Sequence, residues 1–327
     1  MLKTLKQKTG LEVQENVPLK KLTTMGIGGE ARYFIKVNNV HELLAAAKTV
    51  IELKAKFFIL GGGSNIIVSD SGFGGVVIKN ESGEVSIESN EAVVDSGIQL
   101  SVLIRKLAEL DFGGLEFMMG IPGTLGGAVV NNAGAFGDTI SNHLKSITIL
   151  DQEGEVRIVL KEDLKFSYRS SLFKQISGQK KVIILRVRLI LRQGAREEIA
   201  RKINNYLRLR ADQPKGMTCG SYFKNPRVEI IEESWEPIIK DGRIPAGYLL
   251  EQINAKGRKE GGVFVSPQHA NWIMNKGKGK AEEVRILADF LKADVERKFG
   301  IRLEEEIEYI GFENDEIRNP NDESNPN

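Results

Sequence analysis

The distribution of glycine constrains this chain more than any other feature of its sequence. Of the 34 glycines in 327 residues, 19 fall between Gly26 and Gly137, which is about a third of the chain. Glycine adopts backbone conformations that other residues avoid, and it lets a ligand or a second backbone segment approach closely. The region from 26 to 137 is therefore expected to use bare backbone for tight packing or for ligand contact.

The first glycine cluster, Gly26-Ile27-Gly28-Gly29, formally begins a dinucleotide-binding fingerprint. That fingerprint requires a buried strand before the glycines and a helix after them. Here a polar segment precedes Gly26 and the strand-like run 33–37 follows the cluster, so the order is wrong for a Rossmann fold. The sequence also lacks G-x-x-x-x-G-K-[ST], which excludes a P-loop.

The second cluster, Gly61-Gly62-Gly63-Ser64-Asn65, lies between two apolar runs and permits two interpretations. One is a tight turn, because glycine is the usual residue at positive φ. The other is a concave anion site in which consecutive peptide N–H groups, together with Ser64 and Asn65, would accommodate a pyrophosphate.

The third cluster extends from Gly120 to Gly137 and contains Gly123-Thr124-Leu125-Gly126-Gly127-Ala128. Pro122 fixes the entry, and Thr124 occupies a plausible helix N-cap position. A helix start with such small residues lets a phosphorylated ligand approach its N–H groups and its dipole. A purely structural packing role is the alternative.

The remaining pattern mixes strands and helices. Helical spacing of apolar residues predicts helices over 40–51, 100–107, 196–210, 247–254 and 281–299, the last closed by Gly300 in a left-handed conformation. Strands are expected at 33–37, 57–60, 66–68, 76–78, 84–88, 92–94, 182–191, 263–265 and 301–310, with a hairpin at 147–150 and 156–160. The segment 211–216, which contains Pro214 and Gly216, breaks the preceding helix and predicts a domain boundary.

Charge and cysteine content exclude several classes of partner. A net charge of +2 without a clustered basic field argues against nucleic acid, and no apolar run approaches the roughly 20 residues of a membrane span. A single cysteine, Cys219, excludes an internal disulfide, and the polar first residues lack a signal-peptide core, which fits the cytoplasm. The three histidines, His41, His143 and His269, show no metal-ligand spacing, so no metal is expected.

Four polar groups are candidates for chemistry, each with a structural alternative. Arg169, beside Tyr168, is either a solvated strand end or a carboxylate ligand. Cys219 is either a small buried side chain or a thiol nucleophile with His269 as its base, although no positioned acid supports the latter. Ser221 has no neighbouring general base in the sequence, so proton donation suits it better than nucleophilic attack. Glu304, Glu306 and Glu308 form either a solvated strand face or a cleft where crowding raises one pKa.

Together these motifs closely resemble one known family. In the right order and at nearly regular spacing, between about residues 15 and 311, the chain carries Thr23-Thr24 with Gly28-Gly29, Leu60-Gly61-Gly62-Gly63-Ser64-Asn65, Gly120-Ile121-Pro122-Gly123-Thr124-Leu125-Gly126-Gly127-Ala128, Asn132-Ala133-Gly134-Ala135, Tyr168-Arg169, Gly220-Ser221-Tyr222-Phe223-Lys224-Asn225-Pro226, His269-Ala270-Asn271 and Leu303-Glu304-Glu305-Glu306-Ile307. This set resembles the UDP-N-acetylenolpyruvoylglucosamine reductases, or UDP-N-acetylmuramate dehydrogenases. The short connection from Arg169 to Ser221 is similar to their compact second type.

The resemblance implies an α+β chain with an FAD-binding fold of the vanillyl-alcohol-oxidase type. Two subdomains, 15–79 and 80–210, would hold non-covalent FAD, a C-terminal α+β domain, 212–311, would cover the substrate, and a tail, 312–327, would be disordered. The implied reaction belongs to peptidoglycan precursor synthesis. Hydride would pass from NADPH to the flavin and from flavin N5 to C3 of the enolpyruvyl ether, and protonation at C2 would give UDP-N-acetylmuramate. The protein is expected to be monomeric and to bind only small molecules.

Matching the motifs position by position implies specific roles. Arg169 would stabilise negative charge that develops on the substrate carboxylate, Ser221 would protonate C2, and Glu306 would assist at the carboxylate. The cofactor contacts implied are Thr24, Gly61, Gly62, Gly63, Ser64, Asn65, Gly123, Thr124, Gly126, Gly127 and Ala128. The substrate contacts implied are Tyr168, Lys224, Asn225, Gln268 and His269. The resemblance gives Cys219 no role.

Two other functions compete with this interpretation. A flavin oxidase or dehydrogenase of the same fold, acting on a small alcohol or hydroxy acid, would not need an arginine, a serine and a glutamate in these three places. A non-catalytic nucleotide-binding module would be colourless when purified, whereas a flavoprotein would be yellow.

Overall fold

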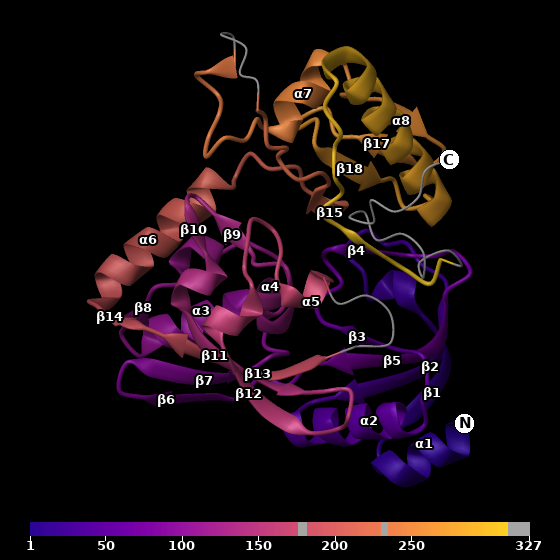
Figure 1. Ribbon diagram of the computed structural model, residues 1–327, viewed down its shortest axis with the longest axis vertical. Coiled ribbons are helices and arrows are strands. Elements are labelled where there is room, and N and C mark those ends of the chain that lie inside the picture. Colours follow the sequence, from indigo (N-terminus) through magenta and orange to yellow (C-terminus); the bar gives the residue numbers. More distant parts are fainter. Residues whose placement is uncertain (176–181, 230–234, 313–327) are drawn as a thin grey trace. The chain divides into compact units, whose positions relative to one another are not determined.

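The computed structural model describes residues 1–175, 182–229 and 235–312, which form two compact units (Figure 1). The first unit contains 1–17, 31–62 and 74–211, and the second contains 18–30, 63–73 and the chain from 212 onward. The second unit thus includes two short segments of the glycine-rich region. Apart from Phe312, the tail expected at 312–327 lies outside the described residues.

A four-stranded sheet begins the first unit. Its strand order is β1 (Val13–Pro18), β2 (Glu30–Val37), β5 (Phe73–Asn80) and β3 (Phe57–Leu60). Helices α1 (Leu2–Thr9) and α2 (Val40–Glu52) lie side by side against it (Figure 1) and share an apolar core with its strands. The Asn39 side chain begins α2 by accepting a hydrogen bond from the Glu42 N–H, as an N-cap residue does. Helix α2 confirms the predicted helix, whereas α1 was not predicted.

A five-stranded antiparallel sheet forms the rest of the first unit's core. Its order is β12 (Val156–Leu160), β11 (Leu144–Leu150), β13 (Ile183–Ile190), β7 (Glu91–Asp95) and β6 (Val85–Glu88). The predicted hairpin is confirmed, because Ile147 pairs with Val159. The helices of this part are α3 (Leu100–Glu109), α4 (Leu125–Val130), α5 (Leu172–Gln175) and α6 (Arg196–Leu209), and its short strand pairs are β8 (Phe112–Gly113) with β14 (Arg192–Gln193) and β9 (Gly134–Ala135) with β10 (Asp138–Thr139).

The second unit is built on another antiparallel sheet. Its order is β15 (Met217–Ser221), β18 (Trp272–Asn275), β17 (Val263–Val265) and β16 (Lys259–Glu260). Helices α7 (Ala246–Gln252) and α8 (Ala281–Phe299) share its apolar core, and Gly300 ends α8 at φ 66°, as predicted. Strand β19 (Glu308–Ile310) pairs in parallel with β4 (Ile66–Val68), which joins the end of the chain to a segment near its start.

One predicted strand is mostly wrong. The alternating segment 301–310 forms a regular strand only at β19, and residues 301–307 are irregular apart from an isolated bridge between Glu305 and Phe223. Its alternation of apolar and acidic residues still matches burial, because Leu303 and Ile307 are buried while Glu304 and Glu308 are exposed. The pattern therefore predicted which side chains are buried but not the backbone conformation.

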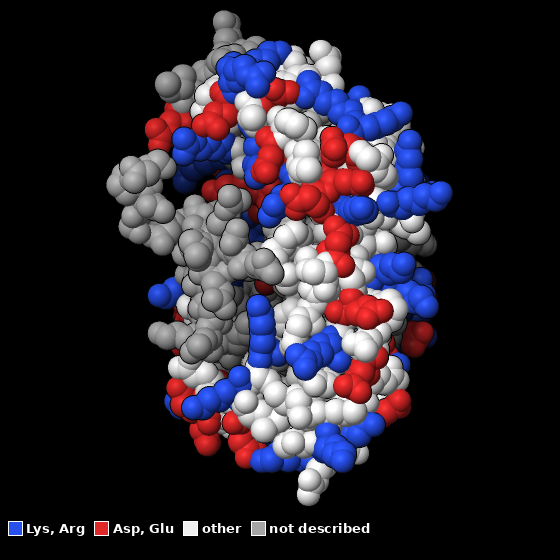
Figure 2. All heavy atoms as spheres, turned by 90° about the vertical axis from the view of Figure 1, so that its right-hand side faces the viewer, with Lys and Arg blue, Asp and Glu red and all other residues white. Residues whose placement is uncertain are grey.

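The surface charges agree with the small net charge. On the face that Figure 2 shows, acidic and basic side chains are interspersed rather than gathered by sign. Within the described part of the chain, no helix is long and apolar enough to cross a membrane. The same residues include no group of three or more metal-ligating side chains that could hold a metal ion.

Candidate functional site

Gly61 and Gly62 of the second glycine cluster meet the third cluster inside the first unit through bare backbone. A Cβ atom added to Gly62 would lie 2.6 Å from the Cα of Gly123, and one added to Gly61 would lie 2.4 Å from Oγ1 of Thr124. Contacts that short do not occur in proteins, so a side chain at Gly62 would force backbone to move. The two loops are therefore fixed against each other by the absence of side chains.

The hydrogen bonds of α4 weaken one argument for an anion at its start. Thr124 is the N-cap, as predicted, and its Oγ1 accepts from the Gly127 N–H. The N–H groups of Leu125 and Gly126 donate to the carbonyls of Ile98 and Ser96. The first-turn donors are thus satisfied within the protein, and contacts of Gly126, Gly127 and Ala128 with a cofactor stay predictions.

The backbone donors of the second cluster differ from those of α4. The N–H groups of Gly62 and Gly63 donate no hydrogen bond to any described residue, although Gly63 is buried. Buried peptide N–H groups nearly always have a partner, so a donor like that of Gly63 is typical of a place where a ligand supplies the acceptor. This observation favours the anion-site interpretation of Gly62 and Gly63 over a plain turn.

In the second unit, the Thr23–Thr24 segment lies against Gly63. The Thr24 N–H donates to the Gly63 carbonyl at 3.0 Å, and Thr24 Oγ1 donates to the carbonyl of Thr218 at 2.7 Å. Because Thr218 belongs to β15, the predicted cofactor residue Thr24 is connected to the strand that ends at Ser221.

Ser221 and Glu306 come from distant parts of the sequence and lie on adjacent backbone segments of the second unit. The Glu306 N–H donates to the carbonyl of Tyr222 at 2.8 Å, and the Lys224 N–H donates to the carbonyl of Glu304 at 2.8 Å. Ser221 is exposed at the end of β15, and Glu306 is half-buried. The structure therefore brings together two of the three predicted catalytic residues.

Asn65 holds the other side of the Glu306 backbone. Its Nδ2 donates to the Glu306 carbonyl at 3.1 Å, and its own carbonyl accepts from the Glu308 N–H at 3.0 Å. The sequence indicated a cofactor contact for Asn65. In the structure, the Asn65 amide fixes the segment that carries Glu306.

The predicted substrate residues of the second unit have identifiable partners. Lys224 Nζ forms an ion pair with Glu304 at 3.0 Å, and Asn225 Oδ1 accepts from the N–H of Ala246 at the start of α7. Gln268 and His269 are exposed beside each other, and His269 Nδ1 accepts from the Asn271 N–H. Of these four residues, Lys224 lies nearest in sequence to Ser221.

Cys219 has the properties of a buried thiol rather than a nucleophile. Its Sγ donates to the carbonyl of Ile66, and burial raises the pKa of the thiol to about 12. A thiol with that pKa stays protonated near neutral pH, when catalysis would need the thiolate. The structural interpretation of Cys219 is therefore the better one.

Arg169, the third predicted catalytic residue, lies in the first unit within a tight turn. Ser167 and Ser170 exchange backbone hydrogen bonds at 3.1 Å, and Arg169 between them has φ +53°. A positive φ is uncommon for a residue with a side chain and is often retained at functional sites. The guanidinium lies 5.7 Å from the ring centroid of Tyr168, the neighbouring predicted substrate residue.

A second arginine near Arg169 was missed by the sequence analysis, which placed it only at the end of a charged helix. Burial, and next the charge of Arg169, lower the pKa of Arg210. Arg210 lies 4.9 Å from the ring centroid of Phe136 and donates to the carbonyl of Phe117. Among the described residues it forms no ion pair with a carboxylate, so its guanidinium brings a second positive charge near Arg169, close enough for the charge of Arg169 to affect the pKa of Arg210.

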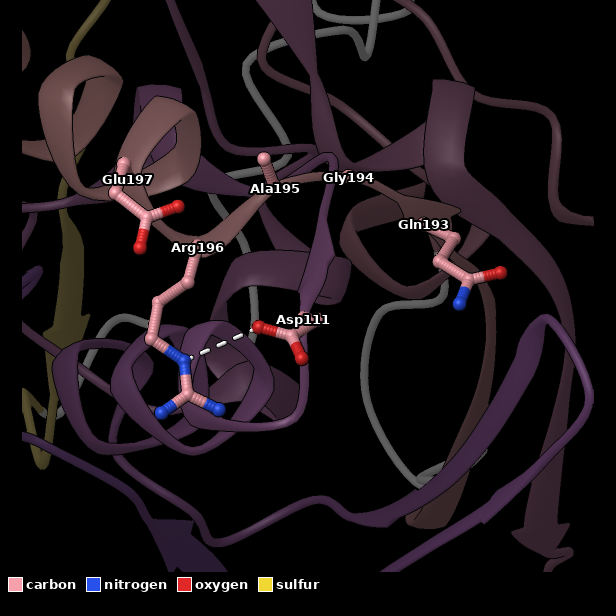
Figure 3. Close-up of a pocket in the computed structure, with 6 residues that line it drawn as sticks. All are labelled: Asp111, Gln193, Gly194, Ala195, Arg196 and Glu197. Carbon is pink, nitrogen blue, oxygen red and sulfur yellow. Dashed lines mark hydrogen bonds and ion pairs between the residues drawn. The ribbon is translucent and has the colours of Figure 1, made fainter.

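One hollow on the surface of the first unit contains none of the predicted site residues. Figure 3 shows it, open to solvent and about 720 Å³ in volume, lined by Asp111 and the segment 193–197. Arg196 Nε donates to Asp111 Oδ1 at 3.1 Å, and both side chains are at least half exposed. An exposed ion pair on an open surface is worth little energetically, so we assign this hollow no part in the reaction.

Comparison with known proteins gives consistent results over nearly the whole chain. Residues 31–159 match an FAD binding domain, and residues 212–310 match the C-terminal domain of UDP-N-acetylenolpyruvoylglucosamine reductase. The chain is 36% identical to the UDP-N-acetylenolpyruvoylglucosamine reductase of Solibacter usitatus, covering 92% of this chain and 97% of that protein, and 35% identical to that of Prochlorococcus marinus, covering 92% and 99%. A crystal structure of the enzyme of that name from Thermus caldophilus superposes with a TM-score of 0.73 at 30% identity, covering 92% and 99%.

Proposed function

Because the chain belongs to the UDP-N-acetylenolpyruvoylglucosamine reductase family, we propose that Arg169, Ser221 and Glu306 carry its reaction. The protein is an FAD-dependent oxidoreductase with the fold expected from the resemblance, an FAD-binding region followed by a separate C-terminal domain. Its activity is the reduction of UDP-N-acetylglucosamine enolpyruvate, with NADPH as the hydride donor. The roles of single residues are the proposal.

The glycine clusters fit a bound FAD. Thr124 and Gly123 lie so close to Gly61 and Gly62 that neither glycine has room for a side chain. The N–H groups of Gly62 and Gly63 are available to phosphate oxygens. Neutral backbone donors of this kind form an anion site without a charged side chain. FAD, when bound, supplies the hydride. Arg169, Ser221 and Glu306 stabilise charge and transfer the proton on the substrate.

Arg169 stabilises the substrate carboxylate. Hydride addition to an enolpyruvyl group moves negative charge onto that carboxylate, and a preorganised cation is worth most where charge develops. The strained turn holds Arg169 in one backbone conformation, and the nearby Arg210 adds to the positive potential.

Ser221 donates the proton from its Oγ to C2. A serine hydroxyl is a weak acid in water, but it suffices toward a basic carbanion when it is aligned. Glu306, whose backbone is held between Tyr222 and Asn65, assists at the carboxylate, a role in which an acidic group is protonated or shares a proton. The observation that supports this proposal most directly is the hydrogen bond from the Glu306 N–H to the carbonyl of Tyr222, because Tyr222 directly follows Ser221 while Glu306 is remote from it in the sequence.

Lys224, Asn225, Gln268, His269 and Tyr168 complete the proposed substrate contacts. Lys224 suits the diphosphate, since its ammonium already pairs with an oxyanion, that of Glu304. The division into subdomains 15–79 and 80–210, the cytoplasmic location and the monomeric state also belong to the proposal.

Anaerobic stopped-flow absorbance tests the function as two separate half-reactions. The purified protein is expected to be yellow, NADPH is expected to bleach the flavin, and the enolpyruvyl nucleotide is expected to restore its colour without oxygen. A colourless protein would support a non-catalytic nucleotide-binding module. Bleached enzyme that is reoxidised quickly by oxygen, but not by the enolpyruvyl nucleotide, would support an oxidase instead.

Replacing Gly62 by alanine is expected to abolish stoichiometric FAD binding. The new Cβ would lie 2.6 Å from the Gly123 backbone, so the two loops must separate. The flavin-to-protein absorbance ratio after desalting measures the effect. Gly74→Ala is the matched control, because a Cβ there has open space, and it should retain full flavin. Normal flavin content in Gly62→Ala would show that this close approach is not required for cofactor binding.

A further inference from the structure

The end of α4 and the Arg169 turn are connected by two side-chain hydrogen bonds within the first unit. Asn132 Nδ2 donates to the carbonyl of Ser167 at 2.8 Å, and Ser171 Oγ donates to the carbonyl of Val130 at 2.6 Å. Ser167 and Ser171 lie on either side of Arg169 in the sequence. The turn is therefore held from both flanks by the residues that end α4.

Both connecting side chains are buried, so breaking either hydrogen bond would leave a buried polar group without a partner. Asn132 is 5% exposed and Ser171 is fully buried. In a buried setting, loss of one partner leaves the other unsatisfied, so such bonds fix a geometry more firmly than exposed ones.

Asn132 holds one side-chain atom at a cost in free energy. Its φ is +43°, and its Oδ1 is buried without a hydrogen-bond partner in the described part of the chain. Asparagine tolerates this φ better than most residues, whereas an unsatisfied buried acceptor costs free energy, and such a group in a native structure calls for an explanation. The residue bonded to the Arg169 turn thus has a positive φ, as Arg169 does, and a buried acceptor without a partner among the described residues.

Helix α4 also connects the Arg169 turn to the glycine loops that contain Gly61 and Gly123. The helix begins at Thr124, whose Oγ1 faces Gly61, and it ends at Val130, whose carbonyl accepts from Ser171. The helix has six residues, so its rise of about 1.5 Å per residue fixes how far apart its two ends lie. The distance from the proposed cofactor loops to the Arg169 turn is therefore set by α4 and these two hydrogen bonds.

We infer that Asn132 is a positioning residue that, together with Ser171, fixes the Arg169 turn relative to the glycine loops at the start of α4. This rests on the proposed function of Arg169 as the ligand of the substrate carboxylate. Asn132 acts through Arg169, so its removal should impair only the step in which charge develops on that carboxylate. Reduction of the flavin by NADPH does not need Arg169 in this role and should continue.

A double-mutant cycle on the FAD-loaded enzyme tests the inference. Asn132→Gly removes the side-chain donor, and glycine accepts the positive φ at this position. Arg169→Asn removes the guanidinium, and asparagine likewise tolerates the positive φ of the turn. Asn132→Gly alone is expected to slow flavin reoxidation by the enolpyruvyl nucleotide about 100-fold, the scale of a small misplacement of a catalytic group. In the Arg169→Asn background, Asn132→Gly is expected to slow flavin reoxidation further by less than about threefold, because the two residues act as one unit.

Controls and contrary outcomes separate this inference from the proposed function. Asn90→Gly, at an exposed turn between β6 and β7, is the matched control and should leave both half-reactions unchanged. Equal losses from Asn132→Gly in the two backgrounds, or no loss in either, would overturn the positioning role. If Asn132→Gly loses its flavin, Ser171→Ala is put through the same cycle with the same criteria. Normal reoxidation in Arg169→Asn alone would refute the proposed role of Arg169, and the inference would fall with it.

Discussion

Enzyme with Ser221 replaced by alanine is expected to retain FAD, to be bleached by NADPH at the normal rate, and to lose about 10²- to 10⁴-fold in reoxidation by the enolpyruvyl nucleotide. The loss follows from the absence of the Oγ proton at C2, which only the second half-reaction needs. Stopped-flow measurement of both half-reactions on one preparation gives the comparison directly.

Two further variants sharpen this result. Ser221→Thr keeps a hydroxyl on the same strand end and should recover part of the lost rate. Ser86→Ala removes a serine hydroxyl from strand β6 and should change neither half-reaction. If Ser221→Ala slows the NADPH step as much as the substrate step, the serine shapes the site in general and is not the proton donor.

Replacement of Arg169 by asparagine is expected to slow the second half-reaction about 10²- to 10³-fold, the scale on which a single preorganised electrostatic group contributes. Asparagine tolerates the positive φ of this turn better than most residues, so the fold should be preserved. Flavin content and thermal unfolding verify that, and the reoxidation rate gives the catalytic effect.

The type of cation provides a second comparison at this position. Arg169→Lys keeps the charge but loses the planar fork that matches a carboxylate, so it should recover only part of the rate. Arg201→Asn, on the exposed surface of α6, is the matched control and should behave as the unmodified enzyme. Full activity in Arg169→Lys would show that the site requires charge alone.

Local elements could be predicted from the sequence because their causes are local. Helix α8, with its Gly300 cap, and the hairpin β11–β12 occur where apolar spacing and turn residues placed them. The Thr124 cap is another such case. By contrast, α1 is mostly polar with one fully buried residue, Leu5, and its helical pattern was too weak to detect.

Long-range pairing could not be predicted in this way. Nothing near Asn65 in the sequence indicates that its amide would hold Glu306, and nothing near Asn132 indicates a bond to Ser167. The motif resemblance selected Ser221 and Glu306, but the backbone hydrogen bond that brings them together depends on the folded second unit. Residues that act through others in this way are found by their contacts and burial.

The parallel pairing of β4 with β19 has a consequence for folding during protein synthesis. Residues 66–68 are translated more than two hundred residues before their partner strand, 308–310. Domains usually fold during synthesis in order from the N-terminus. The segments 18–30 and 63–73 belong to the same unit as the chain from 212 onward, so their apolar side chains lack those partners until that part of the chain has been made. That interval is when nascent chains of this protein should depend most on chaperones.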